Sequence, residues 1–459
     1  MKFVSRISMS FVFLFFSNIA ISKNASFQSL GDLTGGDFSS CAYCLSADGS
    51  VVAGQATTGL GWAAFVWTQN TGMVALGNFP DHSLKHSWPI DISADGSVIV
   101  GWGNTTSEPY NDEGQRGFIW TEKTGMTWIG DRNRVAHADG VSADGKVVVG
   151  TIEGQAFRWS QDEGLQMLGI LEGCNYSSAT AVSDDGEIIT GSCSKVMYED
   201  EVTFIWTRDS GMKSLGYLPG DVYSFPNAIS PDGSVIAGSS YDKYMRESAY
   251  RWTEETGMVK IDHLPGREVT HPTGVTSFGK IIVGGSFKDM IGAAFIWDAA
   301  QGTRNLQSVL QSDYNLNIEG WALRLAYEIS HDGNVIVGSG INSSGNEEAF
   351  RIVLDTTVSD AEQSIQPSGF ELKQNYPNPF NPSTHIQYSL EKSAQINLSI
   401  YNIFGQRVKT LVDAFQNTGE QTLVWDGTDA NNNPVSSGIY IYQMKANDQI
   451  LQRKMLLVR

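Results

Sequence analysis

A unit of about 40 to 50 residues recurs seven times in this sequence, and this repeat constrains the fold more than any other feature. Each copy contains a serine, an Asp-Gly pair, a run of β-branched residues and a glycine, as in residues 46–54 (SADGSVVAG). The sixth copy, residues 277–284 (SFGKIIVG), has lost the aspartate. The turn glycines are Gly49, Gly96, Gly145, Gly186, Gly233, Gly279 and Gly333. Asp-Gly between apolar runs predicts a tight β hairpin, because both residues tolerate the positive φ that such turns require.

Two further signatures follow each hairpin and predict two more strands. The pattern aromatic-x-Trp recurs in six copies, as in residues 65–67 (FVW), and the seventh copy reads FRI at 350–352. A Gly-Met segment or a variant of it comes next, as in residues 72–77 (GMVALG). Four short strands in a unit of this length are typical of a β-propeller blade. The repeated tryptophan is predicted to be a large apolar wedge between neighbouring blades.

The number of strands predicts how the ring closes. The seventh copy ends at Asp355 without a fourth strand, whereas residues 27–33 (FQSLGDL) match the fourth-strand residues 73–79 (MVALGNF). An N-terminal strand that completes the last blade removes the open edges of a propeller. The sequence therefore predicts an all-β fold with a seven-bladed β-propeller over residues 23–354. An open β-solenoid is the alternative, although it would not need a complementary N-terminal strand.

The start of the aromatic strand relates these units to a known family. This strand contains Ala-Phe or Ala-Tyr in five copies, at Ala64, Ala156, Ala249, Ala294 and Ala349. The units over about residues 27–354 resemble the extracellular repeats of the HAF family, which is named after a His-Ala-Phe strand. The histidine is absent from all five copies. The resemblance implies export from the cell, but that family has no established activity, so no catalytic residue follows from it.

The N-terminus has the pattern of a secretory signal peptide. Lys2 and Arg6 precede apolar residues 11–16 and 19–21, and Ala20 and Ser22 supply small residues for cleavage. We therefore predict that residues 1–22 are removed. An uncleaved membrane anchor is the alternative, but the apolar run is shorter than the ~20 residues that a bilayer requires. No segment of the predicted mature protein is long and apolar enough to span a membrane.

The C-terminal residues predict a second domain. Residues 355–368 lack periodicity and are predicted to be a linker. Residues 369–459 begin with a proline-rich segment, YPNPFNP at 376–382, and continue as short alternating strands. The expected strands are 385–390, 395–402, 407–412, 422–425, 438–445 and 450–458. Strands of this number and length predict a small Ig-like β-sandwich.

This tail resembles the type A C-terminal sorting domain of the type IX secretion system and the Ig-like domain of flagellar hook-capping proteins. The motif residues are Tyr376, Pro377, Asn378, Pro379, Phe380, Asn381, Pro382, Gly438, Tyr440 and Lys454. The resemblance implies recognition of residues 369–459 by the type IX secretion machinery. It also implies delivery across the outer membrane of a Gram-negative bacterium. An Ig-like module without a sorting role is the alternative.

The four cysteines allow several disulfide arrangements. Cys174 and Cys193 flank a hairpin on adjacent strands or their loops, so a disulfide between them is predicted in an exported protein. A bridge between Cys41 and Cys44 is a further candidate. Four cysteines permit three pairings, and the sequence does not choose among them.

No residue pattern predicts a catalytic, metal or cofactor site. Each Asp-Gly turn offers one carboxylate, whereas calcium needs several oxygen ligands at short spacing. The oxygen-rich segment 426–433 is predicted to be an ordinary polar turn. The motifs of metalloproteases, serine hydrolases and phosphate-binding loops are absent, and no pair of carboxylates stands out as a glycosidase site.

Loop lengths predict where a ligand would bind. The first-to-second and third-to-fourth turns of a blade share one face and are uniformly short here. The opposite face carries long, variable segments that are rich in aromatic and acidic residues, which favours binding there. The candidate ligand residues are Trp88, Trp102, Tyr110, Tyr198, Tyr223, Tyr241, Tyr244 and His263. Tolerated surface insertions are the alternative explanation of these segments.

Charge excludes one class of partner. The chain has 31 Lys and Arg against 50 Asp and Glu, and its formal net charge is −19. All of this excess lies in the predicted propeller and linker, because residues 1–22 and 369–459 sum to +2 and +1. An acidic surface repels phosphate backbones, so no nucleic-acid partner is expected.

The predicted function is that of an exported cell-surface or secreted β-propeller that binds a glycan or protein ligand. The alternative is a secreted hydrolase or lyase acting on polysaccharide or peptide, with its site on the long-loop face. A structural role in a surface layer is a third hypothesis. A cluster of carboxylates with a histidine in the central channel would favour the enzyme, whereas an aromatic-rich loop face would favour binding.

Overall fold

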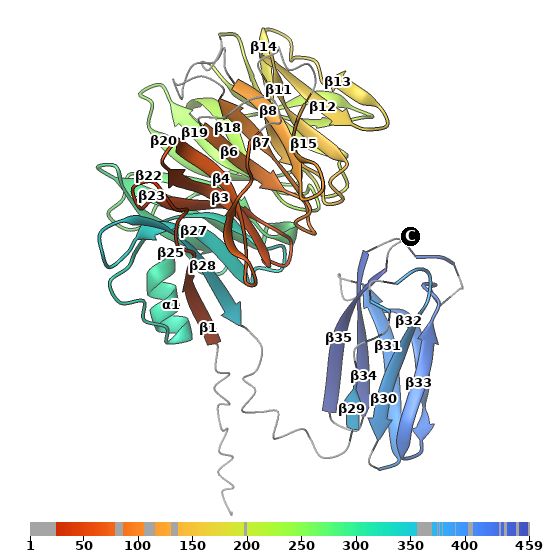
Figure 1. Cartoon of the computed structure of the whole chain (residues 1–459). Helices are drawn as coiled ribbons and strands as arrows, with labels where there is room; N and C mark the ends of the chain where they lie inside the picture. Colours follow the sequence, from red (N-terminus) through yellow and green to blue (C-terminus); the bar gives the residue numbers. More distant parts are fainter. Residues whose placement is uncertain are drawn as a thin grey trace, which may run out of the picture. The chain divides into compact units, whose positions relative to one another are not determined.

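The computed structural model divides the chain into two compact units, Met1–Thr357 and Val358–Arg459 (Figure 1). The first unit is described over residues 24–78, 86–104, 115–129, 136–196 and 200–355. The second is described over 370–457 except 374, 376, 379, 391, 403–406, 431–432, 436–437 and 447–448. The predicted signal peptide and all of the predicted linker except Asp355 lie outside these ranges. Within them, no helix has both the length and the apolar character needed to cross a membrane.

The first unit is the predicted all-β propeller. Its described residues form seven antiparallel four-stranded sheets, which follow one another along the chain and are numbered here as blades. Blade 1 contains β2 (Ser40–Leu45), β3 (Val51–Thr58), β4 (Gly61–Thr68) and β5 (Gly72–Ala75). Blade 2 contains β6 (His86–Ile92), β7 (Val98–Asn104), β8 (Gln115–Thr121) and β9 (Gly125–Trp128). Blade 3 contains β10 (Ala136–Val141), β11 (Val147–Ile152), β12 (Gln155–Ser160) and β13 (Gly164–Met167).

The remaining blades repeat this order. Blade 4 contains β14 (Tyr176–Val182), β15 (Ile188–Ser194), β16 (Val202–Thr207) and β17 (Gly211–Gly216). Blade 5 contains β18 (Asp221–Ile229), β19 (Ile236–Asp242), β20 (Glu247–Thr253) and β21 (Gly257–Ile261). Blade 6 contains β22 (Val269–Val275), β23 (Ile281–Lys288), β24 (Ile291–Asp298) and β25 (Gly302–Asn305). Blade 7 contains β26 (Ala322–Ile329), β27 (Val335–Ile341), β28 (Glu347–Asp355) and β1 (Asn24–Ser29).

The N-terminal strand closes the ring, as predicted. Strand β1 pairs antiparallel with β28 and is the outermost strand of blade 7 (Figure 1). The Leu30 N–H donates to the Ala349 carbonyl at 3.0 Å, just as the Leu76 N–H donates to the Ala64 carbonyl at 2.9 Å in blade 1. The N-terminal segment therefore has the register of a fourth strand, which excludes the open solenoid.

The repeated Ser-x-Asp-Gly segment forms the hairpin between the first two strands of a blade. In blade 1 the Ser46 hydroxyl donates to Asp48 at 2.7 Å and accepts the Val51 N–H at 3.0 Å. Gly49 has a φ of 68°, and a Cβ at this position would lie 2.5 Å from Val335 of blade 7. Glycine is therefore required both by the turn and by the close approach of the neighbouring blade.

The variable residue of each hairpin joins neighbouring blades through its backbone. The Ala47 N–H donates to the Ala94 carbonyl at 3.0 Å, and the same bond recurs from blade to blade around the propeller axis. The bond from blade 5 to blade 6 is missing, because the residue in blade 5 is Pro231 and proline has no N–H. We call these residues the hairpin ring: Ala47, Ala94, Ala143, Asp184, Pro231, Ser277 and His331.

The aromatic strand supplies the core between blades, but the prediction for its tryptophan was only partly right. The first aromatic residue of the motif is fully buried in every copy, at Phe65, Phe118, Phe157, Phe204, Tyr250, Phe295 and Phe350. Trp67 is 4% exposed, whereas the tryptophan is half-buried in the other five copies. The tryptophan lies at the end of its strand beside the third-to-fourth turn and packs toward the preceding blade, as Trp67 does on Val335 and Val337 of blade 7.

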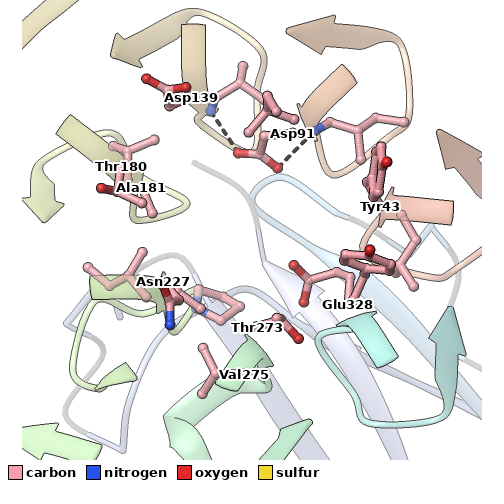
Figure 2. Close-up of a pocket in the computed structure, with 18 of the residues that line it drawn as sticks. Tyr43, Asp91, Asp139, Thr180, Ala181, Asn227, Thr273, Val275 and Glu328 are labelled. Atoms are coloured by element: carbon pink, nitrogen blue, oxygen red, sulfur yellow. Dashed lines mark hydrogen bonds between the residues drawn. The ribbon is translucent and has the colours of Figure 1, made fainter. Parts of the chain in front are cut away.

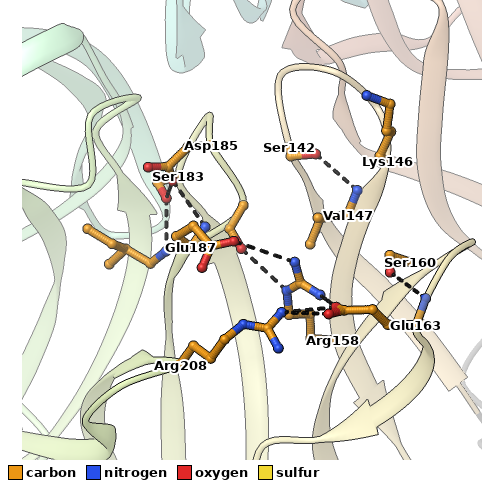
Figure 3. Close-up of polar contacts among 12 residues, drawn as sticks. Ser142, Lys146, Val147, Arg158, Ser160, Glu163, Ser183, Asp185, Glu187 and Arg208 are labelled. Carbon is orange, nitrogen blue, oxygen red and sulfur yellow. Dashed lines mark hydrogen bonds and ion pairs between the residues drawn. The ribbon is translucent and has the colours of Figure 1, made fainter. Parts of the chain in front are cut away.

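A polar network also joins blades 3 and 4 at the hairpin face (Figure 3). The buried Arg158 guanidinium donates to the Gly186 carbonyl of the next hairpin at 3.4 Å and pairs with Glu163 at 2.5 Å. Arg208 pairs with the same Glu163 carboxylate at 3.0 Å. Arg351 makes the equivalent bond from blade 7 to the Gly49 carbonyl at 2.9 Å. In blades 3 and 7, arginine in the middle of the aromatic strand thus fixes the position of the following hairpin, whereas the Arg251 Nε of blade 5 has no hydrogen-bond partner among the described residues.

One helix was not predicted. Helix α1 (Leu306–Tyr314) follows β25 and packs on blade 6 and blade 7 through Leu306, Val309 and Leu310. The Asn305 side chain caps it by accepting the Ser308 N–H at 2.9 Å. This insertion accounts for the longest spacing between turn glycines, which separates Gly279 from Gly333.

The second unit is an Ig-like β-sandwich, as predicted. One sheet contains β29 (Phe370–Leu372), β30 (Thr384–Leu390) and β33 (Gly419–Trp425) in that order. The other contains β32 (Arg407–Gln416), β31 (Ala394–Asn402), β34 (Gly438–Ala446) and β35 (Gln449–Leu457). The buried Trp425 ring lies between the sheets, with ring centroids 5.5 Å from Phe380 and 4.9 Å from Tyr440. Six of the strands match expected ones, and β29 was missed because it has only three residues.

Candidate functional site: the axial channel

A cavity of about 650 Å³ runs along the propeller axis (Figure 2). The first strand of every blade contributes to its wall: β2, β6, β10, β14, β18, β22 and β26. One end lies at the hairpin ring. The other end, which we call the mouth, lies on the face opposite the hairpins.

Each inner strand carries a β-bulge at the same place. In blade 1 the register against β3 shifts between Ala42 and Cys44, so that Tyr43 has no partner. A bulge re-aims the side chain of its extra residue. The seven extra residues all line the channel, and we call them the bulge ring: Tyr43, Ile90, Asp139, Thr180, Asn227, Thr273 and Tyr327.

An aliphatic ring separates the bulge ring from the hairpin ring. It lies two residues further along each inner strand, where alternation returns the side chain to the channel. Its members are Leu45, Ile92, Val141, Val182, Ile229, Val275 and Ile329. The channel is therefore layered: polar residues lie in its middle, and an apolar collar lies beneath them.

Two carboxyl groups flank Tyr43, one from each neighbouring blade (Figure 2). Asp91 accepts the Ile92 N–H at 2.7 Å and the Val141 N–H of blade 3 at 2.8 Å. Burial raises the pKa of Asp91 to about 6, although these two bonds oppose the shift. Burial and the nearby charge of Asp91 raise the pKa of Glu328 to about 8. Glu328 is therefore largely protonated at neutral pH.

Two more carboxyl groups lie further round the channel. Asp139 of the bulge ring makes no hydrogen bond to any described residue, and burial alone raises its pKa to about 7. Burial and three neighbouring aspartates raise the pKa of Asp184 to about 7. Asp184 lies 3.5 Å from the His331 ring, whose pKa burial lowers. In the part of the chain that the structure describes, no three His, Cys, Asp or Glu residues are placed to hold a metal ion.

A row of four stacked rings lies at the mouth. Trp88 of β6 and Trp102 of β7 are register partners whose ring centroids lie 4.1 Å apart at an interplanar angle of 22°. His86 stacks on Trp88 at 5.6 Å, and His137 stacks on Trp102 at 4.9 Å. The Gln115 side chain holds the His137 ring at 2.5 Å. We call these four rings the aromatic row, of which Trp88 and His137 line the channel.

Blade 5 carries a smaller aromatic cluster near the same mouth. Tyr241 stacks on Phe225 with centroids 5.6 Å apart, and Phe225 lies 6.5 Å from the His271 ring. Tyr223 is the register partner of Tyr241 on β18. His271 lines the channel and lies 3.0 Å from the Glu247 carboxylate.

The structure places the candidate ligand residues on strands more than on loops. Trp88, Trp102, Tyr223 and Tyr241 all lie within strands, because the alternating pattern continues further than the sequence indicated. The opposite face was expected to carry long segments, but β19 and β20 are joined there by a turn of only four residues.

Two further candidates, Tyr244 and His263, lie apart from the channel. Tyr244 is 67% exposed at the tip of the turn between β19 and β20, where Lys243 and Arg246 lie over its ring. His263 contacts the Thr270 hydroxyl at 3.0 Å and does not line the channel. Tyr110 and Tyr198 lie outside the described residues.

The cysteine predictions have different outcomes. All four cysteines are free thiols in the structure. The predicted Cys41–Cys44 bridge is wrong, because both residues lie on the extended strand β2, which places their Cα atoms about 10 Å apart, beyond disulfide reach. Cys174 and Cys193 lie close enough for a thiol–thiol hydrogen bond, and burial raises the pKa of Cys193 to about 12.

The tail motif organises one end of the sandwich. The side chain of the buried Asn375 donates to the Pro377 carbonyl at 3.1 Å and to the Thr384 hydroxyl at 2.9 Å. Phe380 is buried and its backbone bridges to Leu457. The other described motif positions are Asn378, Asn381, Pro382, Gly438, Tyr440 and Lys454, although the Lys454 side chain is not described. Tyr376 and Pro379 lie outside the described residues.

Sequence reasoning missed the channel carboxyls. Asp91, Asp139 and Glu328 immediately precede the hairpin segments of blades 2, 3 and 7, where the other blades have uncharged residues. The sequence does carry a signal for them, because an ionisable residue stands at a repeat position that is uncharged in the other copies. Asp184, the variable residue of its hairpin, could have been found in the same way.

The chain was compared with family models, curated proteins and solved structures. No curated protein matches the sequence, and residues 381–449 match the family model of the FlgD Ig-like domain. The chain is similar to oligogalacturonate lyase from Vibrio parahaemolyticus, with 12% identity, a TM-score of 0.46, and coverage of 72% of this chain and 97% of that one. The Dos1 propeller is 10% identical, with a TM-score of 0.42 and coverage of 72% of this chain and 94% of that one. TolB from Acinetobacter baumannii is 13% identical, with a TM-score of 0.38 and coverage of 57% of this chain and 61% of that one. The match therefore spans about three fifths of that protein. Similarities at this level concern the fold alone.

Proposed function

We propose that this protein is an exported β-propeller that binds a glycan or protein ligand at the mouth of its axial channel. The observation that supports the proposal most is the aromatic row, a stack of two indole rings and two imidazoles of which Trp88 and His137 line a cavity large enough for a small ligand. Stacked rings offer a rigid apolar face at low conformational cost. They lie on strands of adjacent blades, so the platform is preorganised.

Binding arrays and matched variants test this proposal. Residues 23–459 would be screened on a glycan array and against a peptide library, and each hit measured by calorimetry. We expect Trp88→Ala to weaken binding at least about tenfold, because aromatic anchors carry much of the binding energy of a site. Phe278→Ala, at an exposed ring in a hairpin turn on the opposite face, is the control and should bind normally. Hits whose affinity is unaffected by Trp88→Ala would place binding elsewhere.

The route of export is the second part of the proposal. Residues 1–22 direct the chain to the periplasm, and the Ig-like tail is read by the type IX secretion machinery, as its motif resemblance implies. The HAF resemblance of the blades supports an extracellular location. In a Gram-negative host with this machinery, deleting 370–459 should leave the propeller in the periplasm. Surface delivery of the truncated chain would contradict the sorting role. A chain that lacks residues 24–30 but keeps the tail is the control, because it shows whether damage to the propeller alone prevents delivery.

A secreted hydrolase or lyase is the second candidate function. The channel contains four carboxyl groups with raised pKa values, of which Asp184 lies 3.5 Å from the His331 ring, and protonated carboxyls near neutral pH can act as general acids. A panel of polysaccharides and peptides, assayed for new reducing ends, unsaturated products or free amines, distinguishes the two. Turnover that is lost in Glu328→Gln would favour the enzyme, whereas retention without turnover would favour the binding module.

A further inference from the structure

We propose that the ligand enters the channel with a cationic group, an alkylammonium or guanidinium, which rests in the bulge ring. This inference rests on the proposed binding function and narrows the chemistry of the ligand. The cation is carried either by a small molecule or by a Lys or Arg side chain of a peptide.

The channel wall is unbalanced in charge. Asp91, Asp139, Asp184 and Glu328 line it, and no described lysine or arginine does. Asp139 lies in the bulge ring with its carboxyl unpaired among the described residues and partly exposed to the channel. An isolated carboxylate in such a site is costly, and a bound cation is the partner that it lacks.

Aromatic rings border the path to these carboxyls. A cation that passes the mouth reaches Tyr43 and Tyr327, whose rings pack edge to face at 4.8 Å, whereas the Trp88 ring already stacks on His86 and Trp102. Aromatic faces attract cations through the ring quadrupole, with tryptophan the strongest. The aromatic rings and the carboxyl groups therefore both favour a positively charged group.

The depth of the site follows from its layers. The aliphatic ring below the bulge ring offers no polar group that could compensate a charge. A cation should therefore stop at the level of Asp139 and Glu328. The less polar remainder of the ligand would then lie against the aromatic row.

Calorimetry with matched probes tests the charge requirement. The chain from residue 23 would be titrated with choline and with its neutral isostere 3,3-dimethylbutanol, then with spermidine and with an acetylated, amidated Arg-Lys dipeptide. We expect each probe that binds to do so at least about tenfold more tightly than a neutral analogue. Binding of choline or spermidine indicates a small-molecule ligand, whereas binding of the dipeptide alone indicates a peptide side chain.

Variants locate the cation. Asp139→Asn should weaken cation binding at least about tenfold, whereas Asp209→Asn, on an exposed turn, should not. Thr180→Lys places an internal cation in the bulge ring and should bind the probes at least about tenfold more weakly than Thr180→Met. Equal binding of choline and its isostere, or cation binding that none of these variants changes, would overturn the inference.

The outcomes separate this inference from the broader function. If a neutral glycan binds in a manner that depends on Trp88 and no cationic probe binds, the binding module stands and the cation site falls. If neither array hits nor cationic probes bind, both fall. Cation binding that is lost in Asp139→Asn and in Trp88→Ala supports both.

Discussion

Replacing Asp139 by asparagine should stabilise the propeller at high pH and leave its stability nearly unchanged at low pH. The folded protein holds the Asp139 pKa near 7, above the ordinary value of 3.8, because burial disfavours the charged form. Below about pH 4 the carboxyl is protonated in the folded and the unfolded state, so the folded state has its full stability. This stability is lost as the pH rises through 7, because the folded protein must then hold the charged form. At about 1.4 kcal/mol per pH unit, the full loss is about 4 kcal/mol, an upper limit that water entering the channel reduces.

Denaturant unfolding at two pH values measures this effect. Residues 23–459 and the variant would be unfolded in urea at pH 4.5 and pH 8.5 and followed by tryptophan fluorescence. This signal reports on the propeller, since every tryptophan except Trp425 lies before residue 355. Asparagine does not titrate, so the variant should gain stability over the wild type only at the higher pH. An equal gain at both pH values, or a loss at pH 8.5, would refute the buried-charge reasoning. Asp209→Asn serves as the exposed control.

Three other predictions concern the scaffold. Gly54→Ala should destabilise the propeller by about 3 kcal/mol in urea unfolding, because its Cβ would lie 2.1 Å from a carbonyl oxygen of β2; the open turn position Gly72→Ala should cost less. Deleting residues 24–30 should lower the melting temperature and expose an edge of blade 7, which calorimetry and light scattering would detect; an unchanged melting temperature would deny the closing role of β1. Mild oxidation should join Cys174 to Cys193 and leave two titratable thiols in the denatured chain, whereas four would contradict the pairing.

The scaffold could be predicted because its rules are local and repeated. An Asp-Gly turn needs only its own residues and the neighbouring apolar runs, and seven copies average out the decay of any one, such as the sixth. The closing strand could be predicted because residues 27–33 carry the pattern of a fourth strand. Hydrogen bonding places both in the same register, as Leu30 and Leu76 show.

The site could be predicted only in part, for a physical reason. A bulge adds one residue to a strand of about seven and leaves no mark in the alternation that the sequence displays. Because the sequence does not reveal the bulge, it cannot show that the side chains of Asp139 and Tyr43 lie in the channel. Trp88 and Trp102 were identified by residue type, but their stacking depends on the pairing of β6 with β7.

The departures from the repeat show how a symmetric scaffold acquires an asymmetric site. Every blade supplies the same bulge position, yet its occupant differs, and the charged residues at or next to it come from blades 2, 3 and 7. Blades 4, 5 and 6 supply Thr180, Asn227 and Thr273 there, so the opposite arc of the bulge ring is polar but neutral, and Asp184 of blade 4 lies deeper, in the hairpin ring. The aromatic row belongs to blades 2 and 3, beside Asp91 and Asp139. A ligand held by both features would therefore lie against one wall of the channel, and uncharged substitutions at Thr180 or Thr273 would alter its fit more than its charge recognition.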